Sequence, residues 1–408
     1  MRKMKDSGIP WIGEIPEDWT IRKGKNLFSI TTGKLDVNAE NSKGSYPFFT
    51  CSMAPKRIDS YSFDCEALLV AGNGLVGFTQ YFKGKFDAYQ RTYVLYDFVE
   101  VNPLFLKYYV SNNLSTEVSP KSVGSVIQFI KLGDLRNFNV ALPCVDEQLR
   151  IVNFLDTECA RIDAVMEQTR ASIEEYKKLK QSIITEAVTK GIRPNRPMKD
   201  SGIDWIGQIP ADWEVYRIAN LYDERNENGQ EDLPILSVSI NTGISDHEVA
   251  DEEQTRVFVR SEDKTKYKRV YPGDLAYNMM RAWQGAFGAV RVDGMVSPAY
   301  VVAKPKQGVN LDSRFMEALL RTPSAVEEMH RYSRGITDFR LRLYWPEFKN
   351  IRVCIPSETE QYEIADFIDE KSIEFDALIA KKEQFLSEME SYKKSLIFEY
   401  VTGKKEIV

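Results

Sequence analysis

The sequence predicts an α+β protein with two globular domains in a pseudo-two-fold arrangement, separated by two long helices that pair as an antiparallel coiled coil. Three observations support this prediction: a repeated opening, a repeated long segment with coiled-coil periodicity, and a divergent, strand-rich middle in each half. A chain of 408 residues has room for two or three domains. We therefore expect a first domain (1–143), a central helix and linker (144–197), a second domain (198–355) and a C-terminal helix (356–408).

The opening of the chain occurs twice. Residues 4–19 recur as residues 198–213, and 13 of the 16 positions are identical at an offset of 194. A second repeat, with an offset of 213, relates residues 143–189 to residues 356–402. The two offsets differ by 19, so the middle of the second half is 19 residues longer. Two copies are too few for a solenoid and indicate two halves whose divergent middles do different versions of one task.

Each half ends in a segment with the periodicity of a paired helix. Mainly apolar residues recur at spacings that alternate between four and three residues. This average period of 3.5 residues is typical of a coiled-coil seam. A helix of about 45 residues would be about 67 Å long, which favours a rigid spacer over the alternative of an ordinary core helix. The predicted seam residues are Ile162, Met166, Ile173, Tyr176, Ile183, Phe375, Ile379, Leu386, Met389 and Leu396.

The ends of these segments also fit helices. Ser357 to Glu360 has the pattern of a capping box, and Gly191 and Gly403 stand where a helix C-cap is expected. Lys180 and Lys393 interrupt the seam at equivalent positions. A polar seam residue can set the register of the pair, or its long side chain can extend to solvent.

The middles, 20–143 and 214–355, contain short apolar runs bounded by Gly, Pro and Asn, a pattern typical of strands. Gly72 to Gly77 formally matches a dinucleotide-binding fingerprint. That fingerprint needs a following helix, whose N-terminus holds the pyrophosphate, but the residues after Gly77 favour a strand. We therefore interpret the glycine-rich segment as a hairpin turn.

Composition limits the possible functions. The net charge of −6 is uneven: residues 1–143 carry 17 basic against 14 acidic residues, and the last 53 residues carry 7 against 13. Five scattered cysteines indicate reduced thiols, and neither a long apolar run nor a signal-peptide pattern is visible, so we expect a cytoplasmic protein without a membrane span. Two histidines, no Cys-x-x-Cys and no phosphate-binding loop predict no metal ligands and no catalytic residues.

The repeated motifs, taken in order, resemble the specificity subunits of type I restriction-modification systems. The motif Gly-x-x-Trp-Ile-Gly-x-Ile-Pro-x-Asp-Trp starts at Gly8 and again at Gly202. The motif Pro-x-x-x-Glu-Gln-x-x-Ile starts at Pro143 and again at Pro356. Tyr-Lys-Lys runs and a closing Val-Thr in both halves also fit, so the resemblance covers essentially the whole chain.

This resemblance implies that each middle is a target recognition domain for one half of a bipartite double-stranded DNA site. The helix pair would set the gap between the two halves. Two modification subunits, which carry AdoMet and methylate adenine N6, would dock on the chain, and two motor-nuclease subunits that use ATP and Mg can join. The chain itself would bind no cofactor and perform no catalysis.

Base recognition in the major groove uses Arg, Lys, Asn, Gln or short hydroxyl side chains, which work best on loops of a rigid domain. Two polar loops just before the common tail fit this requirement, and two further segments are second candidates. Any one of these side chains can instead be an ordinary solvated residue. The predicted DNA-binding residues are Lys121, Ser125, Gln128, Arg334, Thr337, Asp338 and Arg340, followed by Gln90, Arg91, Arg281 and Gln284.

Four tryptophans, Trp11, Trp19, Trp205 and Trp213, lie in the near-identical openings and so cannot distinguish two different half-sites. We interpret them as packing anchors where each opening meets the other half. Two other function classes stay open at this point. One is a self-contained nuclease or methyltransferase, and the other is a coiled-coil scaffold that does not bind DNA.

Overall fold

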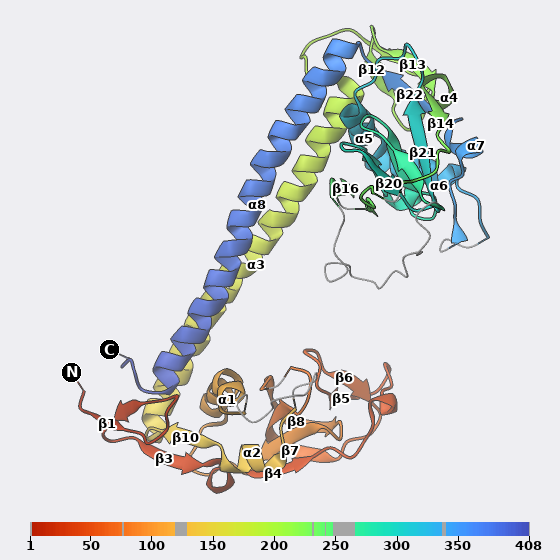
Figure 1. Cartoon of the computed structure of the whole chain (residues 1–408). Helices are drawn as coiled ribbons and strands as arrows, with labels where there is room; N and C mark the ends of the chain where they lie inside the picture. Colours follow the sequence, from red (N-terminus) through yellow and green to blue (C-terminus); the bar gives the residue numbers. More distant parts are fainter. Residues whose placement is uncertain are drawn as a thin grey trace. The chain divides into compact units, whose positions relative to one another are not determined.

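The computed structural model describes residues 2–75, 77–118, 129–230, 232–240, 242–247, 266–336 and 340–407. They form two compact units, Met1–Arg170 with Lys382–Val408 (unit 1) and Ala171–Lys381 (unit 2). The long helices α3 (Val145–Lys190) and α8 (Glu358–Val401) each contribute one part to each unit (Figure 1). Each unit thus contains one globular domain and a paired stretch of both helices.

Unit 1 is built on a six-stranded sheet with the order β4-β9-β7-β8-β5-β6. All neighbours are antiparallel except β5 and β8, which are parallel. Helix α1 (Pro103–Val118) lies beside β7 and β8, and its Phe105 and Tyr109 are fully buried in the main core of the unit (Figure 1). The strands are β4 (Ser29–Thr32), β5 (Tyr46–Phe49), β6 (Lys56–Ile58), β7 (Phe63–Ala71), β8 (Thr79–Ala88) and β9 (Thr92–Tyr96).

The glycine-rich segment is the hairpin connection that the sequence predicts. Strands β7 and β8 pair antiparallel with Val70 opposite Thr79, and Gly74 and Gly77 have φ of +72° and +85°. Left-handed backbone of this kind favours glycine because it has no Cβ. A strand, rather than a helix, therefore follows the glycines.

Unit 2 has a four-stranded antiparallel sheet with the order β14-β21-β18-β19. Helices α5 (Ser313–Leu320) and α6 (Pro323–Tyr332) are amphipathic, and α5 buries Phe315, Met316, Leu319 and Leu320 in the core of unit 2. The strands of this sheet are β14 (Tyr222–Glu224), β18 (Leu275–Asn278), β19 (Phe287–Ala289) and β21 (Tyr300–Pro305). Two smaller two-stranded sheets pair β15 (Val238–Ser239) to β16 (Gly243–Ile244), and β17 (Lys268–Val270) to β20 (Gly294–Val296).

Each unit carries the same frame around its sheet. A short hairpin is formed by β1 (Met4–Asp6) and β2 (Glu14–Pro16) in unit 1, and by β11 (Met198–Asp200) and β12 (Gln208–Pro210) in unit 2. A second strand pair then leads into the long helix: β3 (Thr20–Lys23) with β10 (Asn139–Leu142), and β13 (Glu214–Arg217) with β22 (Arg352–Ile355). Before β10 and β22 lie α2 (Leu132–Asn137) and α7 (Trp345–Phe348), and a short helix α4 (Ile218–Leu221) follows β13.

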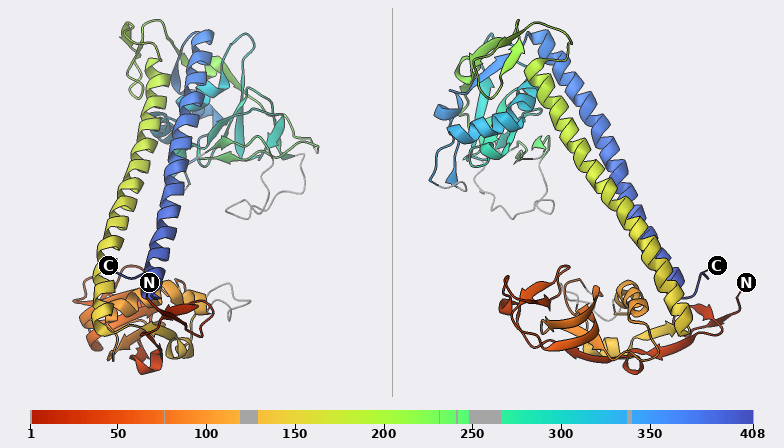
Figure 2. Two further views of the ribbon diagram at one scale, coloured as in Figure 1. Left: turned by 90° about the vertical axis from the view of Figure 1, so that its left-hand side faces the viewer. Right: turned by 180° about the vertical axis from the view of Figure 1, so that it is seen from behind.

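The segments of α3 and α8 lie side by side and antiparallel within each unit (Figure 2). In unit 1 the rings of Phe154 and Tyr400 are 4.4 Å apart, and in unit 2 those of Tyr176 and Phe375 are 6.1 Å apart. Residue numbers fall on α8 as they rise on α3, which is the antiparallel direction. All ten predicted seam residues are buried or half-buried. The predicted α+β class and the antiparallel helix pair are confirmed.

The two seam lysines make ion pairs across the helix pair. Nζ of Lys180 lies 2.8 Å from Oδ1 of Asp376, and Nζ of Lys393 lies 2.6 Å from Oδ1 of Asp163. Both partners follow the offset of 213, so one interaction is the repeat of the other. Each lysine thus has a specific partner on the opposite helix.

Replacing Lys180 with leucine is expected to stabilise unit 2 by about 1 kcal/mol, because a half-buried ion pair often contributes less than apolar packing at the same place. Lys180 is 23% exposed, whereas its partner Asp376 is 64% exposed and stays solvated without it. Urea denaturation of Lys180→Leu tests this, with the exposed Lys178→Leu as the control. A lower urea midpoint for Lys180→Leu than for Lys178→Leu would contradict the expectation.

Candidate nucleic-acid interface

Each opening is fixed by a buried carboxylate in the first turn of a long helix. In unit 1 the indole Nε1 of Trp19, which is 1% exposed, donates to Oε2 of Glu147 at 3.1 Å. Arg2 donates to the same carboxylate at 3.0 Å and also pairs with Asp18, and this hydrogen bond lowers the pKa of Asp18. The opening is thereby attached to the start of α3.

The same arrangement recurs in unit 2. Nε1 of Trp213 donates to Oε2 of Glu360 at 3.2 Å, and Arg196 binds both Glu360 and Asp212. The predicted capping box at Ser357 is therefore only half formed. Oγ of Ser357 accepts from the Glu360 N–H at 3.4 Å. The Glu360 carboxylate, however, accepts from Trp213 in the opening instead of from the backbone N–H of Ser357. The buried indole and guanidinium both need this acceptor, which explains the difference from the sequence prediction.

The tryptophans Trp19 and Trp213 are packing anchors, as predicted, and they meet the ends of the long helices. A Cβ on Gly403, after α8, would lie 3.2 Å from Cη2 of Trp19, and one on Gly191, after α3, would lie 3.5 Å from Cζ2 of Trp213. Both glycines have φ above +70°, which confirms the predicted C-caps. The first opening thus packs against the helix of the second half.

The glutamine of the repeated Glu-Gln motif connects the long helix to its own domain. Gln148 is fully buried and its amide bonds Pro143 O and Glu100 O at 3.0 Å, while its carbonyl accepts from Asn102 N–H. Gln361 makes the corresponding three bonds to Pro356 O, Asn310 O and Asp312 N–H. These contacts attach the first turn of each long helix to the segment that leads into α1 or α5 of the same unit.

In unit 2, two predicted segments that are far apart in the sequence lie next to each other. Leu343 N–H donates to Met279 O at 2.8 Å, and Nη2 of Arg342 lies 3.6 Å from Sδ of Met280. The turn between β18 and β19, which presents Arg281 and Gln284, therefore packs against the segment that contains Arg334 and Arg340. Arg281, Gln284, Arg334 and Arg340 are all exposed.

The second segment folds back on itself. Arg334 and Arg342 form an antiparallel bridge with two backbone hydrogen bonds of 2.9 Å. Gly335 makes the close approach possible, because a Cβ there would lie 2.7 Å from Arg340 O. Nη2 of Arg334 pairs with Oε1 of Glu347 at 2.6 Å, and the guanidinium stays 74% exposed. We call the β18–β19 turn and this Arg334–Arg342 bridge the unit 2 surface.

In unit 1 the equivalent surface surrounds Gly72. Ile130 N–H donates to Gly72 O at 3.0 Å, Gly72 N–H donates to Arg91 O at 3.0 Å, and Asn73 forms an isolated bridge with Phe129. The predicted Gln90 and Arg91 are exposed beside it, and Nε2 of Gln90 donates to Asp36 at 3.1 Å. We call the β7–β8 turn with these neighbours the unit 1 surface.

Several predicted residues lie outside the described part of the chain. They are Lys121, Ser125 and Gln128 in the first half, and Thr337 and Asp338 in the second. The sequence reasoning also missed Asn73, Phe129, Met280 and Arg342, which the folding brings into the two surfaces. The signal was available in part, because Phe129 and Arg342 are related by the offset of 213.

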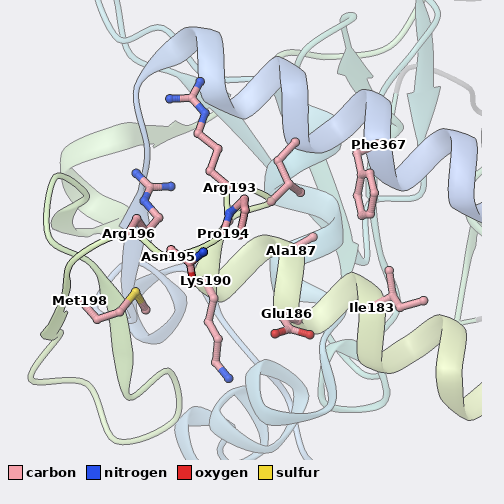
Figure 3. Close-up of a pocket in the computed structure, with 12 residues that line it drawn as sticks. Ile183, Glu186, Ala187, Lys190, Arg193, Pro194, Asn195, Arg196, Met198 and Phe367 are labelled. Carbon is pink, nitrogen blue, oxygen red and sulfur yellow. The ribbon is translucent and has the colours of Figure 1, made fainter.

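A pocket of about 530 Å³ lies beside the joint between α3 and the second opening (Figure 3). Its arginines are already paired: Arg193 with Glu363 at 2.6 Å, and Arg196 with Glu360 and Asp212. Phe367 of α8 lines the same pocket. This pocket therefore belongs to the frame and not to either surface.

Within the described ranges, no cluster of His, Cys, Asp and Glu has the arrangement of a metal site. A search of the same residues finds no helix with the length and apolar character that crossing a membrane requires.

Comparison with known proteins finds similarity to one family. Residues 16–175 match the family described as type I restriction modification DNA specificity domain. The chain is 38% identical over 180 residues to the type I restriction enzyme EcoDI specificity subunit of Escherichia coli, and the alignment covers 43% of this chain but only 39% of that subunit. It is 23% identical over 422 residues to the type I restriction enzyme MjaVIII specificity subunit of Methanocaldococcus jannaschii, covering 96% of this chain and 93% of that one.

The fold has a solved counterpart. A chain in a structure that addresses complex assembly and conformational transition of the type I R-M system matches with a TM-score of 0.66 at 13% identity, covering 96% of this chain and 99% of that one. At this identity the match establishes the fold. Residues 16–175 thus carry a type I restriction modification DNA specificity domain, and the chain is similar over nearly its whole length to a type I restriction enzyme specificity subunit.

Proposed function

We propose that the unit 1 and unit 2 surfaces each recognise one half of a bipartite double-stranded DNA site. One observation carries this proposal. The two units have nearly identical frames, but the unit 1 and unit 2 surfaces, which lie at equivalent places on them, expose different side chains. A shared frame fits a shared docking task, whereas different side chains at matched positions fit two different DNA half-sites. Hydrogen bonds from Arg, Gln and Asn side chains to base edges are the usual means of such recognition.

The predicted side chains have the right chemistry for this task. Arg281, Arg334 and Arg340 in unit 2 present guanidinium groups that can bind a guanine edge or a phosphate, as does Arg91 in unit 1. Gln90 in unit 1 presents an amide that can bind an adenine edge. The exposed arginines concentrate positive charge locally, so the net charge of −6 does not exclude DNA binding. Lys121, Ser125, Gln128, Thr337 and Asp338 stay in the proposal as residues of the same two loops.

The partners follow from the family. Two modification subunits that bind AdoMet would methylate adenine N6 at the site that this chain selects, and two motor-nuclease subunits that use ATP and Mg would cut unmodified DNA. The helix pair would set the gap between the half-sites. This chain would contribute recognition without a catalytic residue or cofactor of its own, and it would act in the cytoplasm.

The proposal predicts a defined methylation pattern. The chain is co-expressed with its modification subunit in a host without adenine methylation, and N6-methyladenine is mapped by long-read sequencing. We expect one motif with two short specific parts around a fixed unspecific gap. A soluble complex that adds no methylation would contradict the proposal and favour a scaffold for proteins.

Affinity for duplex DNA gives an independent measurement. Because cations released from the phosphates drive part of the binding, affinity should fall steeply as salt rises from 50 to 200 mM, by about 10³ or more if six phosphates are contacted. Arg340→Ala should weaken binding by about 10- to 100-fold if that residue binds a guanine edge. Affinity without any salt dependence would contradict a DNA-binding role.

A further inference from the structure

The central strands of the two sheets define an alignment that the divergent sequences do not reveal. In unit 1, β7 pairs with β9, and its last residue, Ala71, lies opposite Thr92. In unit 2, β18 pairs with β21, and its last residue, Asn278, lies opposite Tyr300. The order of the four strands around them is the same, so Ala71 and Asn278 occupy equivalent positions.

The next residue confirms the alignment. Gly72 O accepts from Ile130 N–H at 3.0 Å, and Met279 O accepts from Leu343 N–H at 2.8 Å. Ile130 and Leu343 are both buried and are 213 residues apart, which is the offset of the common tail. The two strand ends are therefore held by the same hydrogen bond to the same position of the repeat.

One residue further along are Asn73 and Met280, at the edge of each surface. We propose that Asn73 and Met280 are matched specificity-determining residues: Asn73 binds an adenine edge through its amide, and Met280 contacts a thymine methyl group. The inference rests on the proposed DNA-binding function and deepens it. It assigns a different base contact to the equivalent position of each domain.

Met280 is an exposed apolar side chain on a fixed backbone. It is 41% exposed, its N–H donates to Oδ1 of Asn278 at 3.0 Å, and its carbonyl accepts from Nε1 of Trp283 at 3.0 Å. Arg342 contacts its sulfur at 3.6 Å. Because the backbone is held on both sides, the thioether is presented at a defined place. A polarisable apolar group next to arginines fits the methyl group that marks thymine in the major groove.

Asn73 presents different chemistry at the matched place. It is half-buried, its backbone bridges Phe129, and within the described ranges its side-chain amide has no hydrogen-bond partner. An amide offers one acceptor and two donors, which complement N6 and N7 of adenine. Neither residue is charged, so each should affect sequence preference without changing the number of phosphates that the protein neutralises.

Methylome mapping of single substitutions tests the inference. Asn73→Met should reduce discrimination at one base pair of one half-site by about 10- to 100-fold, and Met280→Asn should do so in the other half-site. Met280→Leu keeps an apolar group and should preserve the motif. The salt dependence of binding should not change in any of them. Met198→Asn on β11, where Met198 is 40% exposed, and Asn153→Met on α3 are controls that should leave both halves unaltered.

The outcomes separate this inference from the proposed function. If the wild-type complex produces no bipartite motif, the proposed function fails. If the wild-type motif is intact but Asn73→Met and Met280→Asn leave it unchanged, or alter the same half, the inference is overturned. If a variant abolishes methylation, its purified complex with the modification subunit is tested on sites altered at single base pairs. A uniform loss of affinity across these sites would also overturn the inference.

Discussion

Glu360→Ala is expected to destabilise unit 2 by about 3 kcal/mol, because it leaves a buried indole N–H without its acceptor and leaves the largely buried Arg196 guanidinium with the exposed Asp212 alone. The Glu360 side chain is 2% exposed, and Arg196 and Trp213 both bind it. Glu147→Ala should have the corresponding effect on unit 1, through Arg2 and Trp19. Chemical denaturation followed by tryptophan fluorescence measures both, and each variant should shift the transition of one unit.

An exposed glutamate one turn further along α8 provides the matched control. Glu363 also pairs with an arginine, Arg193, but the two side chains are 42% and 54% exposed, so solvent screens the pair. Glu363→Ala should therefore unfold at the same denaturant concentration as the wild type. Glu360→Gln keeps an acceptor for the indole and should fall between Glu360→Ala and the wild type. Equal midpoints for Glu360→Ala and Glu363→Ala would contradict the frame that we describe.

Gly335→Ala is expected to reduce specific DNA affinity by more than about 100-fold, equivalent to about 3 kcal/mol, because the Arg334–Arg342 bridge must open. The added Cβ would lie 2.7 Å from Arg340 O and 3.0 Å from Leu341 Cα. Both neighbours are backbone atoms, so rotation of a side chain cannot relieve the clash. Arg334 and Arg340 would lose their positions together, and two base contacts contribute about 1–3 kcal/mol each.

The affinity of the complex with the modification subunit for duplex DNA that contains the mapped motif measures this effect. Circular dichroism shows whether the rest of unit 2 stays folded. The control is Gly133→Ala in α2, where no atom lies within 4 Å of the added Cβ. Alanine also has the higher helix propensity, so Gly133→Ala should keep full affinity. Full affinity of Gly335→Ala would show that the bridge is not part of the DNA-binding surface.

The sequence alone was sufficient to predict the parts of the fold that occur in both halves of the chain. The offset of 213 aligned two helices, and the period of 3.5 identified their seam, because coiled-coil packing is determined by local spacing. The glycine C-caps and the hairpin at Gly72 followed from backbone rules that need only a few residues. These parts of the fold depend on local patterns, and the structure confirms them.

The sites depend on long-range contacts, which local patterns do not determine. Glu360 had the pattern of a capping residue, but Arg196 and Trp213, more than 140 positions away, bind its carboxylate. Met280 and Arg342 meet through a backbone bond between Met279 and Leu343, and no motif marks that pairing. The equivalence of Asn73 and Met280 needed the strand register, because the two middles have diverged in both length and sequence.

The way each opening meets a helix end sets an order of folding during synthesis. In unit 2, Trp213 packs at Gly191, and the whole unit lies within Ala171–Lys381. In unit 1, Trp19 packs at Gly403, so the frame closes only when Lys382–Val408 has left the ribosome. Contacts this distant in sequence form slowly, because the intervening chain must be brought into a large loop. The domain that is translated first is therefore completed after unit 2, and its apolar opening stays uncovered until Lys382–Val408 is made.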